Sequence, residues 1–480
     1  MSQDKIFSQI FPVACHTDNV GIGTTFVAIK GMKDDGVRHI PLALERGART
    51  IVVERSMSLD IHVIENIKQA GAELLYVESA RKALAVLSAQ AWGFPARKLK
   101  IIAVTGTKGK TTTVFLLEHL LRALGYQTAL LSSVHNRIGN TIYSTALTTQ
   151  HPDYLHAFLS LCVRSRVEWV VMEVAAQAFT LYRTHGIMFD AGIFTNFSSE
   201  HTEFYANLDD YFSAKKQILE QLTLGAPLVV NGDDPRVLGL QKHHTPSYGI
   251  THDSGALYGF CVTKSDLSGI SLLLDGHMLN IPTLMGTFNG YNVAMAYYLL
   301  KSLGLLKDSW RKDLEMFCSV PGRLNRYVLP NGALVFIDYA HTPSSYEAVF
   351  GLMRSLATRL IVVFGAGGER GKEKRPIMGE IASRFADVII LTSDNPRSER
   401  AEDIIAQIVS GIPSDKLHKV TVELDREKAI YQAYALSDKT TAIMLLGKGP
   451  DEYQIINGEK SYFSESQICK NIIAQSREII

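Results

Sequence analysis

The chain has 480 residues, which is too long for one ordinary hydrophobic core and predicts about three domains. Its 49 Lys and Arg residues against 48 Asp and Glu residues give a formal net charge of +1, so long-range attraction to nucleic acid or to an anionic membrane is excluded. No apolar run approaches the ~20 residues of a membrane span, and the N-terminal residues lack the apolar stretch of a signal peptide. We therefore expect a cytosolic protein that binds neither nucleic acid nor membranes.

The cysteines support this expectation of a reducing compartment. They are odd in number, widely scattered and without CxxC or metal-ligand spacing, which predicts reduced core residues. They are Cys15, Cys162, Cys261, Cys318 and Cys469.

Residues 1–97 are expected to form a small α/β unit. The segments TTFVAIKG and ARTIVVE are short apolar runs typical of strands, and HIPLALERGA between them has the pattern of a helix. Gly93 and Pro95 in AWGFPARK break the pattern and predict a linker.

Residues 98–320 are expected to form a central domain around a parallel sheet. The apolar runs KIIAVTG, YQTALLSS, VEWVVMEVA, FDAGIFTN and APLVVNG lack polar alternation and are separated by helical segments, which indicates strands buried on both faces. In the helix after the first run, Val114, Leu117, Leu121 and Leu124 share one face, and Gly125 suits the position after the helix end.

Residues 321–480 repeat this pattern in ALVFIDYAHT, RLIVVFGAGG, DVIILTSDNP and TAIMLLGKGP, which predicts a second, Rossmann-like sheet. The fold class is therefore α/β. Because ligands of such sheets bind beyond the carboxyl ends of the strands, polar residues that follow each run are the first candidates for function.

The stretch AVTGTKGKTTT, residues 103–113, has the composition of a phosphate-binding loop between a strand and a helix. Glycines let backbone N–H groups converge on phosphate oxygens, and the helix N-terminus adds partial positive charge. Lys110 can reach the outer phosphates, and the Thr111 hydroxyl can bind Mg²⁺. Val104 stands where the longer GxxxxGK[ST] pattern has its first glycine, so the loop has a shorter GTxGKT form.

Two further residues follow neighbouring strands of the same predicted sheet. Glu173 ends VVME, and His201 follows GIFTNFSSE, so both are candidate metal ligands near the phosphate loop.

A dozen segments in order give the chain a resemblance to the Mur ligase family over nearly its whole length. Within the family it is most similar to the members that form the UDP-N-acetylmuramoyl-tripeptide. The matching segments are TGTKGKTTT, LTTQHPD, MEVAAQAFTLYR, FTNFSSEH, YFSAKKQ, VVNGDDP, GTFNGYN, VPGRLNR, FIDYAHTP, FGAGGERGKEKRPIMG, TSDNPRSE and GKGPDEYQ. The resemblance implies three domains: an N-terminal domain for the UDP-substrate (1–97), a central P-loop ATPase domain (98–320) and a C-terminal Rossmann-like domain for the amino acid (321–480).

The resemblance also implies a reaction, in which ATP joins a carboxylic acid to an amine through an acyl phosphate. It assigns ATP and Mg²⁺ to named residues, with catalysis by Lys110, Glu173, His201 and Lys215. ATP would be bound by Gly106, Thr107, Lys108, Gly109, Lys110, Thr111, Thr112, Asn292, Arg323, Asp338 and His341. Mg²⁺ would be bound by Thr111, Glu173, His201 and a carbamate on Lys215. The C-terminal domain would close on the central one to exclude water from the acyl phosphate.

For the amine, the sequence DNPR resembles the form found in family members that add meso-diaminopimelate. A guanidinium can bind the distal carboxylate of that amino acid in a bidentate manner, and lysine has no such group. The implied amino-acid contacts are Arg370, Asp394, Asn395, Arg397, Gly447 and Asp451, with Glu452 as an alternative to Asp451.

The acceptor side departs from the family pattern. Its implied contacts are Thr17, Thr148, Thr149 and Arg183. The family's Asp-Ser-Arg for the uridine end is His16-Thr17-Asp18 here, and its EVSSHAL is EVAAQAF, which places Ala175, Ala176 and Gln177 at two serines and a histidine. The acceptor is therefore either UDP-MurNAc-L-Ala-D-Glu or, in a paralogue of specialised metabolism, another carboxylic acid.

Three other interpretations are weaker. A non-catalytic nucleotide-binding protein has no need for both Glu173 and Lys215. FGAGGERG lacks the spacing and acidic partner of a dinucleotide site, and the absence of NKxD disfavours a GTPase. We expect a monomer whose ligands are ATP, the acid and a diamino acid.

Overall fold

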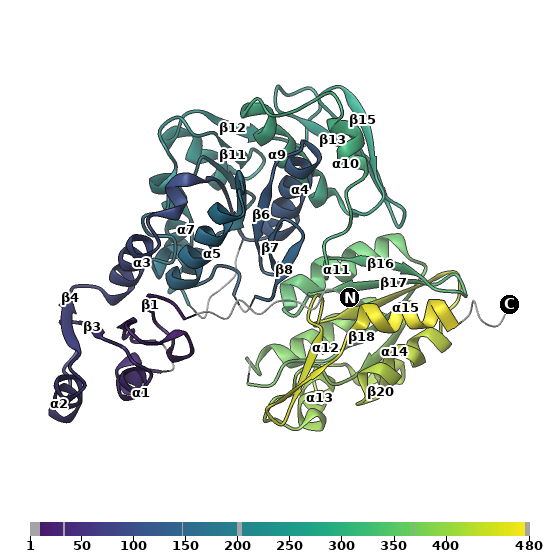
Figure 1. Ribbon diagram of the computed structural model, residues 1–480. Helices are drawn as coiled ribbons and strands as arrows, with labels where there is room; N and C mark the ends of the chain where they lie inside the picture. Colours follow the sequence, from purple (N-terminus) through teal and green to yellow (C-terminus); the bar gives the residue numbers. More distant parts are fainter. Residues whose placement is uncertain (1–9, 32–33, 146, 199–203, 370, 476–480) are drawn as a thin grey trace. The chain divides into compact units, whose positions relative to one another are not determined.

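The computed structural model describes residues 10–31, 34–145, 147–198, 204–369 and 371–475 (Figure 1). The first element group is a four-stranded parallel sheet of order β1-β2-β3-β4. Its strands are β1 (Val13–Ala14), β2 (Thr25–Val27), β3 (Thr50–Glu54) and β4 (Glu73–Val77). Its helices are α1 (Ile40–Glu45), α2 (Ile61–Gln69) and α3 (Ala80–Ala91), with 3-10 helices at Thr17–Asn19, Gly36–His39 and Pro95–Lys98. The strands and the helix predicted in this region are confirmed.

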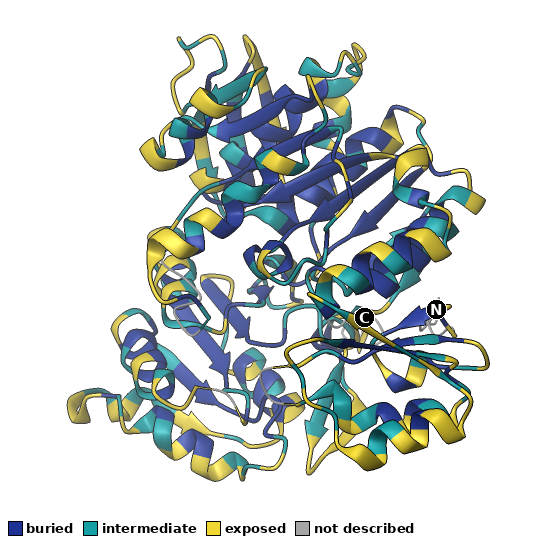
Figure 2. Cartoon of the chain, turned by 90° about the vertical axis from the view of Figure 1, so that its left-hand side faces the viewer, coloured by how far each residue is buried: buried dark blue, intermediate teal, exposed yellow. Residues whose placement is uncertain are grey.

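The central sheet has eight strands in the order β12-β11-β10-β5-β9-β6-β7-β8. The strands are β5 (Lys100–Thr105), β6 (Thr128–Leu131), β7 (Asn136–Ile138), β8 (Thr141–Tyr143), β9 (Trp169–Glu173), β10 (Ala191–Phe194), β11 (Leu228–Asn231) and β12 (Ser247–Ile250). All pair in parallel except β7 and β8, which extend one edge as an antiparallel hairpin. The five apolar runs are thus the parallel core of the sheet, as predicted, and Figure 2 shows such strands as buried ribbons.

The helices that accompany this sheet are α4 (Lys110–Ala123), α5 (Pro152–Arg164), α6 (Ala176–Thr180), α7 (Leu208–Lys216), α8 (Pro235–Leu238), α9 (Thr287–Ser302) and α10 (Trp310–Glu315), with 3-10 helices at Gln217–Gln221 and Gly239–His243. The predicted apolar face of α4 is buried. The helix ends where Gly125 adopts φ +95°, and its N–H donates to Arg122 O over 2.9 Å. Between α8 and α9, the strands β13 (Phe260–Asp266), β14 (Gly269–Leu274) and β15 (His277–Ile281) form a separate three-stranded sheet.

The C-terminal sheet has the order β16-β17-β21-β18-β19-β20, and only β16 is antiparallel. The strands are β16 (Asn325–Val328), β17 (Leu334–Asp338), β18 (Arg359–Phe364), β19 (Val388–Leu391), β20 (Val420–Val422) and β21 (Thr441–Leu446). The helices are α11 (Pro343–Leu356), α12 (Lys374–Phe385), α13 (Ala401–Val409), α14 (Arg426–Ala435) and α15 (Glu465–Gln475), with a 3-10 helix at Ser414–Lys419. A hairpin of β22 (Tyr453–Ile456) and β23 (Glu459–Tyr462) follows β21. The second doubly wound sheet is therefore confirmed.

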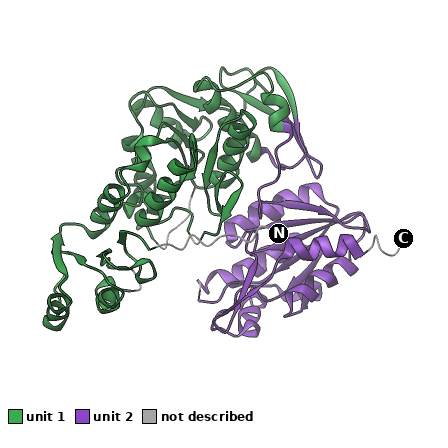
Figure 3. Ribbon diagram, viewed as in Figure 1, with its two compact units in different colours: residues 1–261, 273–279, 288–314 green, residues 262–272, 280–287, 315–480 purple. Residues whose placement is uncertain are grey.

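The chain divides into two compact units, which Figure 3 colours separately. The first contains residues 1–261, 273–279 and 288–314, and the second contains residues 262–272, 280–287 and 315–480. Residues 1–97 thus share a unit with the central sheet, and the finer partition at residues 97 and 320 stays a prediction.

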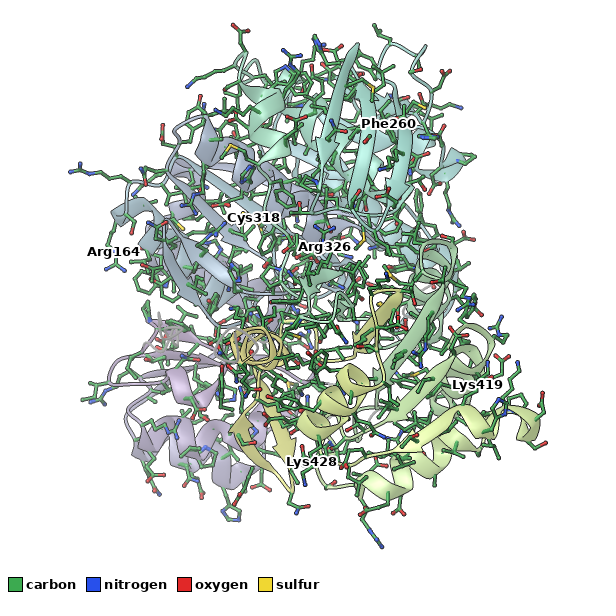
Figure 4. All side chains as sticks on the ribbon, turned by 90° about the vertical axis from the view of Figure 1, so that its right-hand side faces the viewer. Arg164, Phe260, Cys318, Arg326, Lys419 and Lys428 are labelled. Carbon is green, nitrogen blue, oxygen red and sulfur yellow. The ribbon has the colours of Figure 1, made fainter. Side chains whose placement is uncertain are left out.

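The cysteines differ in part from the expectation. All five are free thiols, but only Cys162 and Cys469 are buried, and Cys318, labelled in Figure 4, is exposed. Cys318 follows the short helix α10, where the chain runs along the surface rather than in a strand. Among the described residues, no helix has both the length and the apolar character that crossing a membrane requires.

Candidate functional site

The phosphate loop joins β5 to α4 with two glycines that no other residue could replace without displacement. Gly106 has φ +135°, and a Cβ atom there would lie 2.0 Å from Thr195 Oγ1. Gly109 has φ +85°, and a Cβ atom there would lie 2.4 Å from Asn292 Oδ1. Both positions therefore require glycine for conformation and for space.

The end of β10 holds this loop in place. Asn196 O accepts from Thr107 N over 2.9 Å, and Asn196 Oδ1 accepts from Lys108 N over 2.9 Å. Thr195 Oγ1 donates to Lys108 O over 2.6 Å. The sequence analysis did not single out Thr195 or Asn196, although they follow a strand that pairs directly with β5.

Two lysines bring their ammonium groups to the same carbonyl of the loop. Lys110 Nζ donates to Gly106 O over 3.0 Å and to Thr107 O over 2.8 Å. Lys215 Nζ, on α7, donates to Gly106 O over 2.5 Å, and its side chain is almost fully buried beneath the Tyr211 ring at 4.7 Å. Lys110 and Lys215 thus lie together at the loop, and their catalytic roles stay a prediction.

Glu173 lies at the end of β9 beside the first turn of α4. Its Oε2 accepts from Thr111 Oγ1 over 3.2 Å, and its Oε1 accepts from Ser133 N over 2.9 Å and from Ser133 Oγ over 3.2 Å. The Thr111 and Ser133 hydroxyls are 3.1 Å apart. Ser133 was missed, although it follows β6, the strand beside β9.

These oxygens fit a magnesium ion. Mg²⁺ is bound through one or two protein oxygens together with water and substrate phosphates, and Glu173 and Thr111 supply such oxygens at the loop. Within the described residues no three or more His, Cys, Asp and Glu side chains cluster as a metal site. His201, the further predicted ligand, lies outside the described residues.

The remaining nucleotide residues of this unit also lie at the loop. Thr112 is buried in the first turn of α4. Asn292 on α9 accepts from Thr113 Oγ1 over 3.2 Å and donates to Asn289 Oδ1 over 2.9 Å. Asn292 therefore fixes the start of α4 from a position far along the chain.

The acceptor residues Thr149 and Arg183 are hydrogen-bonded to each other near the end of β9. Thr149 Oγ1 donates to Glu173 O over 2.9 Å and accepts from Ala175 N over 3.1 Å, so its hydroxyl is used by the backbone. Arg183 Nη1 donates to Thr149 O over 2.7 Å, while its buried Nε has no hydrogen-bond partner in the described ranges. Burial, and then nearby Arg81, lowers the pKa of Arg183.

The other two acceptor residues lie in two different segments. Thr17 is buried in the 3-10 helix Thr17–Asn19, and Thr148 is half-buried beside Thr149. Two residues before Thr17, Cys15 N donates to Asp153 Oδ2 over 2.9 Å, which joins the N-terminal strands to the start of α5. Burial, followed by the charge of Arg183, lowers the pKa of His151 at the same helix start.

In the second unit, the predicted nucleotide residues surround the end of β17. Asp338 Oδ2 accepts from Leu324 N over 2.9 Å and its Oδ1 accepts from Ala340 N over 2.8 Å. Burial raises the pKa of Asp338, and the charge of Arg323 opposes this rise. The Tyr339 ring contacts both neighbours, with the Arg323 guanidinium 5.5 Å from its centroid and the His341 ring 4.8 Å away.

The predicted amino-acid residues follow β19 and β21 at the same edge of that sheet. A Cβ atom on Gly447, which has φ +103°, would lie 2.6 Å from Asp394 Oδ2, so the two strand ends are in direct contact. Asn395 Oδ1 accepts from Ile455 N over 3.0 Å. Burial raises the pKa of Asp451, and the charge of Lys448 opposes this rise.

Arg397 lines an open hollow of about 500 Å³ with Glu369, Ser398, Ile455, Asn457 and Gly458. Its guanidinium donates to Gly368 O, and its backbone, at φ +55°, bridges to β22. Glu452 accepts from Ser464 Oγ over 2.9 Å, so this alternative to Asp451 is engaged elsewhere. Arg370 lies outside the described residues.

Known proteins match this arrangement along the chain. Residues 104–300 match the Mur ligase middle domain, and residues 322–449 match the glutamate ligase domain of Mur ligases. The UDP-N-acetylmuramoyl-L-alanyl-D-glutamate--2,6-diaminopimelate ligase of Aquifex aeolicus is 36% identical over 488 residues, covering 98% of this chain and 95% of that protein. The protein of the same name from Parabacteroides distasonis is 33% identical, covering 98% of this chain and 99% of its own.

Solved structures agree on the fold. A UDP-N-acetylmuramoyl-L-alanyl-D-glutamate--2,6-diaminopimelate ligase superposes with a TM-score of 0.64 at 23% identity, covering 98% of this chain and 95% of that one. MurF ligase from Thermotoga maritima in complex with ADP superposes with a TM-score of 0.60 at 18% identity, covering 98% of both chains. The three-domain α/β fold of Mur ligases is thus confirmed, and the chain belongs to the Mur ligase family.

Proposed function

We propose that this protein is an ATP-dependent amide ligase that adds 2,6-diaminopimelate to UDP-N-acetylmuramoyl-L-alanyl-D-glutamate. The relatives named for this reaction are 33 to 36% identical over nearly the full chain. The observation that carries the proposal is that the chain contains two strand-edge sites, each within its own unit: a phosphate loop with two ammonium groups and Glu173, and an edge that presents Asp394 to Arg397.

The chemistry follows from the reactants. A carboxylate is a poor acyl donor, so its oxygen first attacks the outer phosphorus of ATP, which releases ADP and gives an acyl phosphate. The amine of the diamino acid then attacks the acyl carbon, phosphate leaves, and the nitrogen loses a proton. For the first step the protein mainly positions reactants and neutralises charge. Lys110 places its ammonium group at the loop for this purpose, and Lys215 adds a second one only in its uncarbamylated form.

Mg²⁺ held by Glu173 and Thr111 would neutralise phosphate charge when bound. His201 and a carbamate on Lys215 remain further proposed ligands. A carbamate would replace the positive charge of Lys215 by a negative one, so its Gly106 O contact would be given up.

The edge of the C-terminal sheet is suited to bind the diamino acid. Arg397 lies in an open hollow, where its guanidinium donates to the backbone carbonyl of Gly368. A substrate carboxylate would be a stronger partner for it, because charge-assisted bidentate pairs exceed neutral hydrogen bonds in strength. We further propose that the protein acts in the cytoplasm, as a monomer, in the synthesis of peptidoglycan precursors.

A second candidate is the same ligation with another carboxylic acid. It is favoured by the acceptor side, where Ala175 and Ala176 carry no hydroxyl and that of Thr149 already binds backbone groups on both sides. The unpaired Nε of Arg183 still offers a donor to an anionic acceptor of either kind.

One assay separates the candidates. Purified protein is given ATP, UDP-MurNAc-L-Ala-D-Glu and, in parallel, diaminopimelate, lysine or ornithine, and phosphate release is measured. We expect release that needs both the acceptor and diaminopimelate. Absence of release with this acceptor and any of the amines would overturn the proposal and leave the second candidate.

A further inference from the structure

Lys448, directly after Gly447, is a buried cation to which the reaction above assigns no role. Its side chain is 0% exposed. Its Nζ lies 3.1 Å from Asn395 Oδ1 and 3.4 Å from Asp394 Oδ1. Since an ammonium group is strongly hydrated in water, burying it is costly unless fixed partners receive its N–H groups. The partners here are the two residues that open the DNPR segment.

The surroundings of Lys448 hold it in one place. The rings of Tyr453 and Phe463 lie 5.7 and 5.8 Å from its Nζ, within the range of cation–π attraction. Burial lowers the pKa of Lys448, and the charges of Asp394, Glu465 and Asp451 oppose this lowering while that of Arg426 adds to it. The nearby carboxylates therefore offset part of the cost of burying this positive charge.

A second buried pair fixes the backbone on which these groups stand. Arg426 and Glu465 are 0% and 1% exposed and form an ion pair of 2.8 Å. Arg426 also donates to Leu446 O over 2.7 Å and to Ser393 O over 3.4 Å. These carbonyls belong to the residues just before Gly447 and Asp394. Arg426 therefore connects the carboxyl ends of β21 and β19 through its hydrogen bonds.

The hydrogen bonds of Asn395 decide which way its amide points. Its Oδ1 accepts from Lys448 Nζ and from Ile455 N, so the oxygen must face inward. The Nδ2 end, with two N–H donors, then faces away from Lys448. In the reverse orientation the NH₂ group would oppose two other donors, which is strongly unfavourable.

We propose that Lys448 is a positioning residue for the amino-acid substrate: it holds the Asn395 amide with its donors outward and the Asp394 carboxylate beside Gly447. Asn395 then offers N–H groups to a substrate carboxylate, and Asp394 offers oxygen to a substrate ammonium group. Lys448 itself touches no substrate. The inference rests on the proposed function, because it takes the amino acid to bind at Asp394 and Asn395.

The test is the KM of each substrate in Lys448→Met, which keeps the length of the side chain and removes its charge and donors. We expect the KM for diaminopimelate to rise about 10- to 100-fold, the loss typical of a buried hydrogen bond to a charged group. The KM for ATP should change by less than about 3-fold. Lys448→Gln, which keeps a donor, should give an intermediate KM for diaminopimelate.

Lys419→Met is the matched control. Lys419, labelled in Figure 4, donates to Ala386 O over 2.9 Å, just before the amino end of β19, whereas Lys448 acts beyond the carboxyl end. Removing this charge should leave the KM values for diaminopimelate and ATP unchanged.

A double variant tests whether Lys448 acts through Asn395. In an Asn395→Ala background, Lys448→Met and Lys448→Gln should raise the KM for diaminopimelate much less than in the wild type. Should Lys448→Met fail to fold, Lys448→Gln carries both comparisons.

Equal rises in both KM values, no rise, or full additivity with Asn395→Ala would overturn the role of Lys448. The proposed function is judged separately, by whether the wild type releases phosphate with diaminopimelate. A wild type without that activity would overturn both.

Discussion

The two strand-edge sites hold their positive charges in different ways. At the central sheet, Lys110 and Lys215 donate to the carbonyl oxygen of Gly106, a neutral partner within the phosphate loop. At the C-terminal sheet, Lys448 and Arg426 are 0% exposed and contact carboxylates and an amide. At the central sheet, a bound phosphate can replace the carbonyl as the partner of the ammonium groups. At the C-terminal sheet, the carboxylates and the amide remain the partners of the buried cations.

This difference matches what each site has to do. A phosphate group brings its own negative charge, so ammonium groups that rest on carbonyls can turn to it on binding. An amino acid with several charged groups is recognised by donors and acceptors whose orientation is set before it arrives, which lowers the cost of ordering them. We therefore expect changes at the first edge to affect the reaction and changes at the second edge to affect folding or amino-acid use.

The largest expected effect is that of Lys110→Ala. Phosphate release should fall on the order of 10³-fold with every amine, because the lost charge acts before the amine reacts. The unfolding midpoint in urea should stay close to that of the wild type, since the hydrogen bonds of the half-buried lysine to Gly106 O and Thr107 O join groups within one short loop. Lys98→Ala, at an exposed position before the other end of β5, is the control. Activity near that of the wild type would remove the loop from the mechanism.

Glu465→Gln should affect folding instead. It leaves Arg426 buried without its hydrogen-bonded carboxylate, and breaking such a buried pair typically costs about 3 to 5 kcal/mol in the free energy of unfolding. Urea unfolding monitored by circular dichroism measures this loss.

Glu173→Gln is the comparison at the central edge. Glu173 is buried too, but it accepts hydrogen bonds from a backbone N–H and two neutral hydroxyls, so we expect a smaller cost of about 1 to 2 kcal/mol. Equal losses of unfolding free energy in the two variants would contradict the distinction between the two edges.

Arg397→Ala should affect amino-acid use. We expect kcat/KM for diaminopimelate to fall. The fall should correspond to a loss of roughly 2 to 4 kcal/mol in transition-state stabilisation, as for a carboxylate that loses its charged partner. Alanine meets the same backbone requirement at φ +55° as arginine does, so the backbone is not the cause. Arg400→Ala, three residues on and exposed, is the matched control. Unchanged KM and turnover with diaminopimelate would refute the role of Arg397.

The sequence predicts the strands of both large sheets because their apolar runs are long, uninterrupted and followed by polar residues. It also places Lys110, Thr111 and Glu173 correctly at one edge, since parallel strands end together. What it misses are partners whose role depends on contacts far along the chain. Thr195 and Asn196 bond to Thr107 and Lys108 across almost ninety positions, which no local pattern encodes.

Lys448 is missed for a different reason. It stands within GKGP, between residues that the sequence analysis did assign, but lysine is almost always exposed, so nothing in the composition indicates a buried ammonium. Ser133 could have been found, because it follows β6 as Glu173 follows the neighbouring β9. The departures at Ala175 and Ala176 are visible in the sequence, but their consequence depends on which acceptor binds.

The smallest expected effect concerns an ion pair that is only partly fixed. Arg375 is 1% exposed and donates to both oxygens of Glu399, which is 17% exposed. The hydrogen bond from Arg375 lowers the pKa of Glu399 to about 2, with a smaller contribution from the backbone N–H of Glu369. A carboxyl group with a lowered pKa in the folded state stabilises the fold above its unfolded pKa, here 4.5, and loses this contribution as the pH falls toward 2.

Glu399→Gln should therefore unfold more easily than the wild type at pH 7, by about 1 kcal/mol after allowance for solvent screening. Below pH 4.5 this difference should shrink, because Glu399 of the wild type takes up a proton and loses the stabilising negative charge that the variant lacks at every pH. Urea unfolding of both proteins between pH 7 and pH 3 measures the difference. A difference in unfolding free energy that stays constant between pH 7 and pH 3 would show that the pKa of Glu399 is the same in the folded and the unfolded protein. The Arg375–Glu399 pair would then not belong with the fixed charges of the C-terminal sheet.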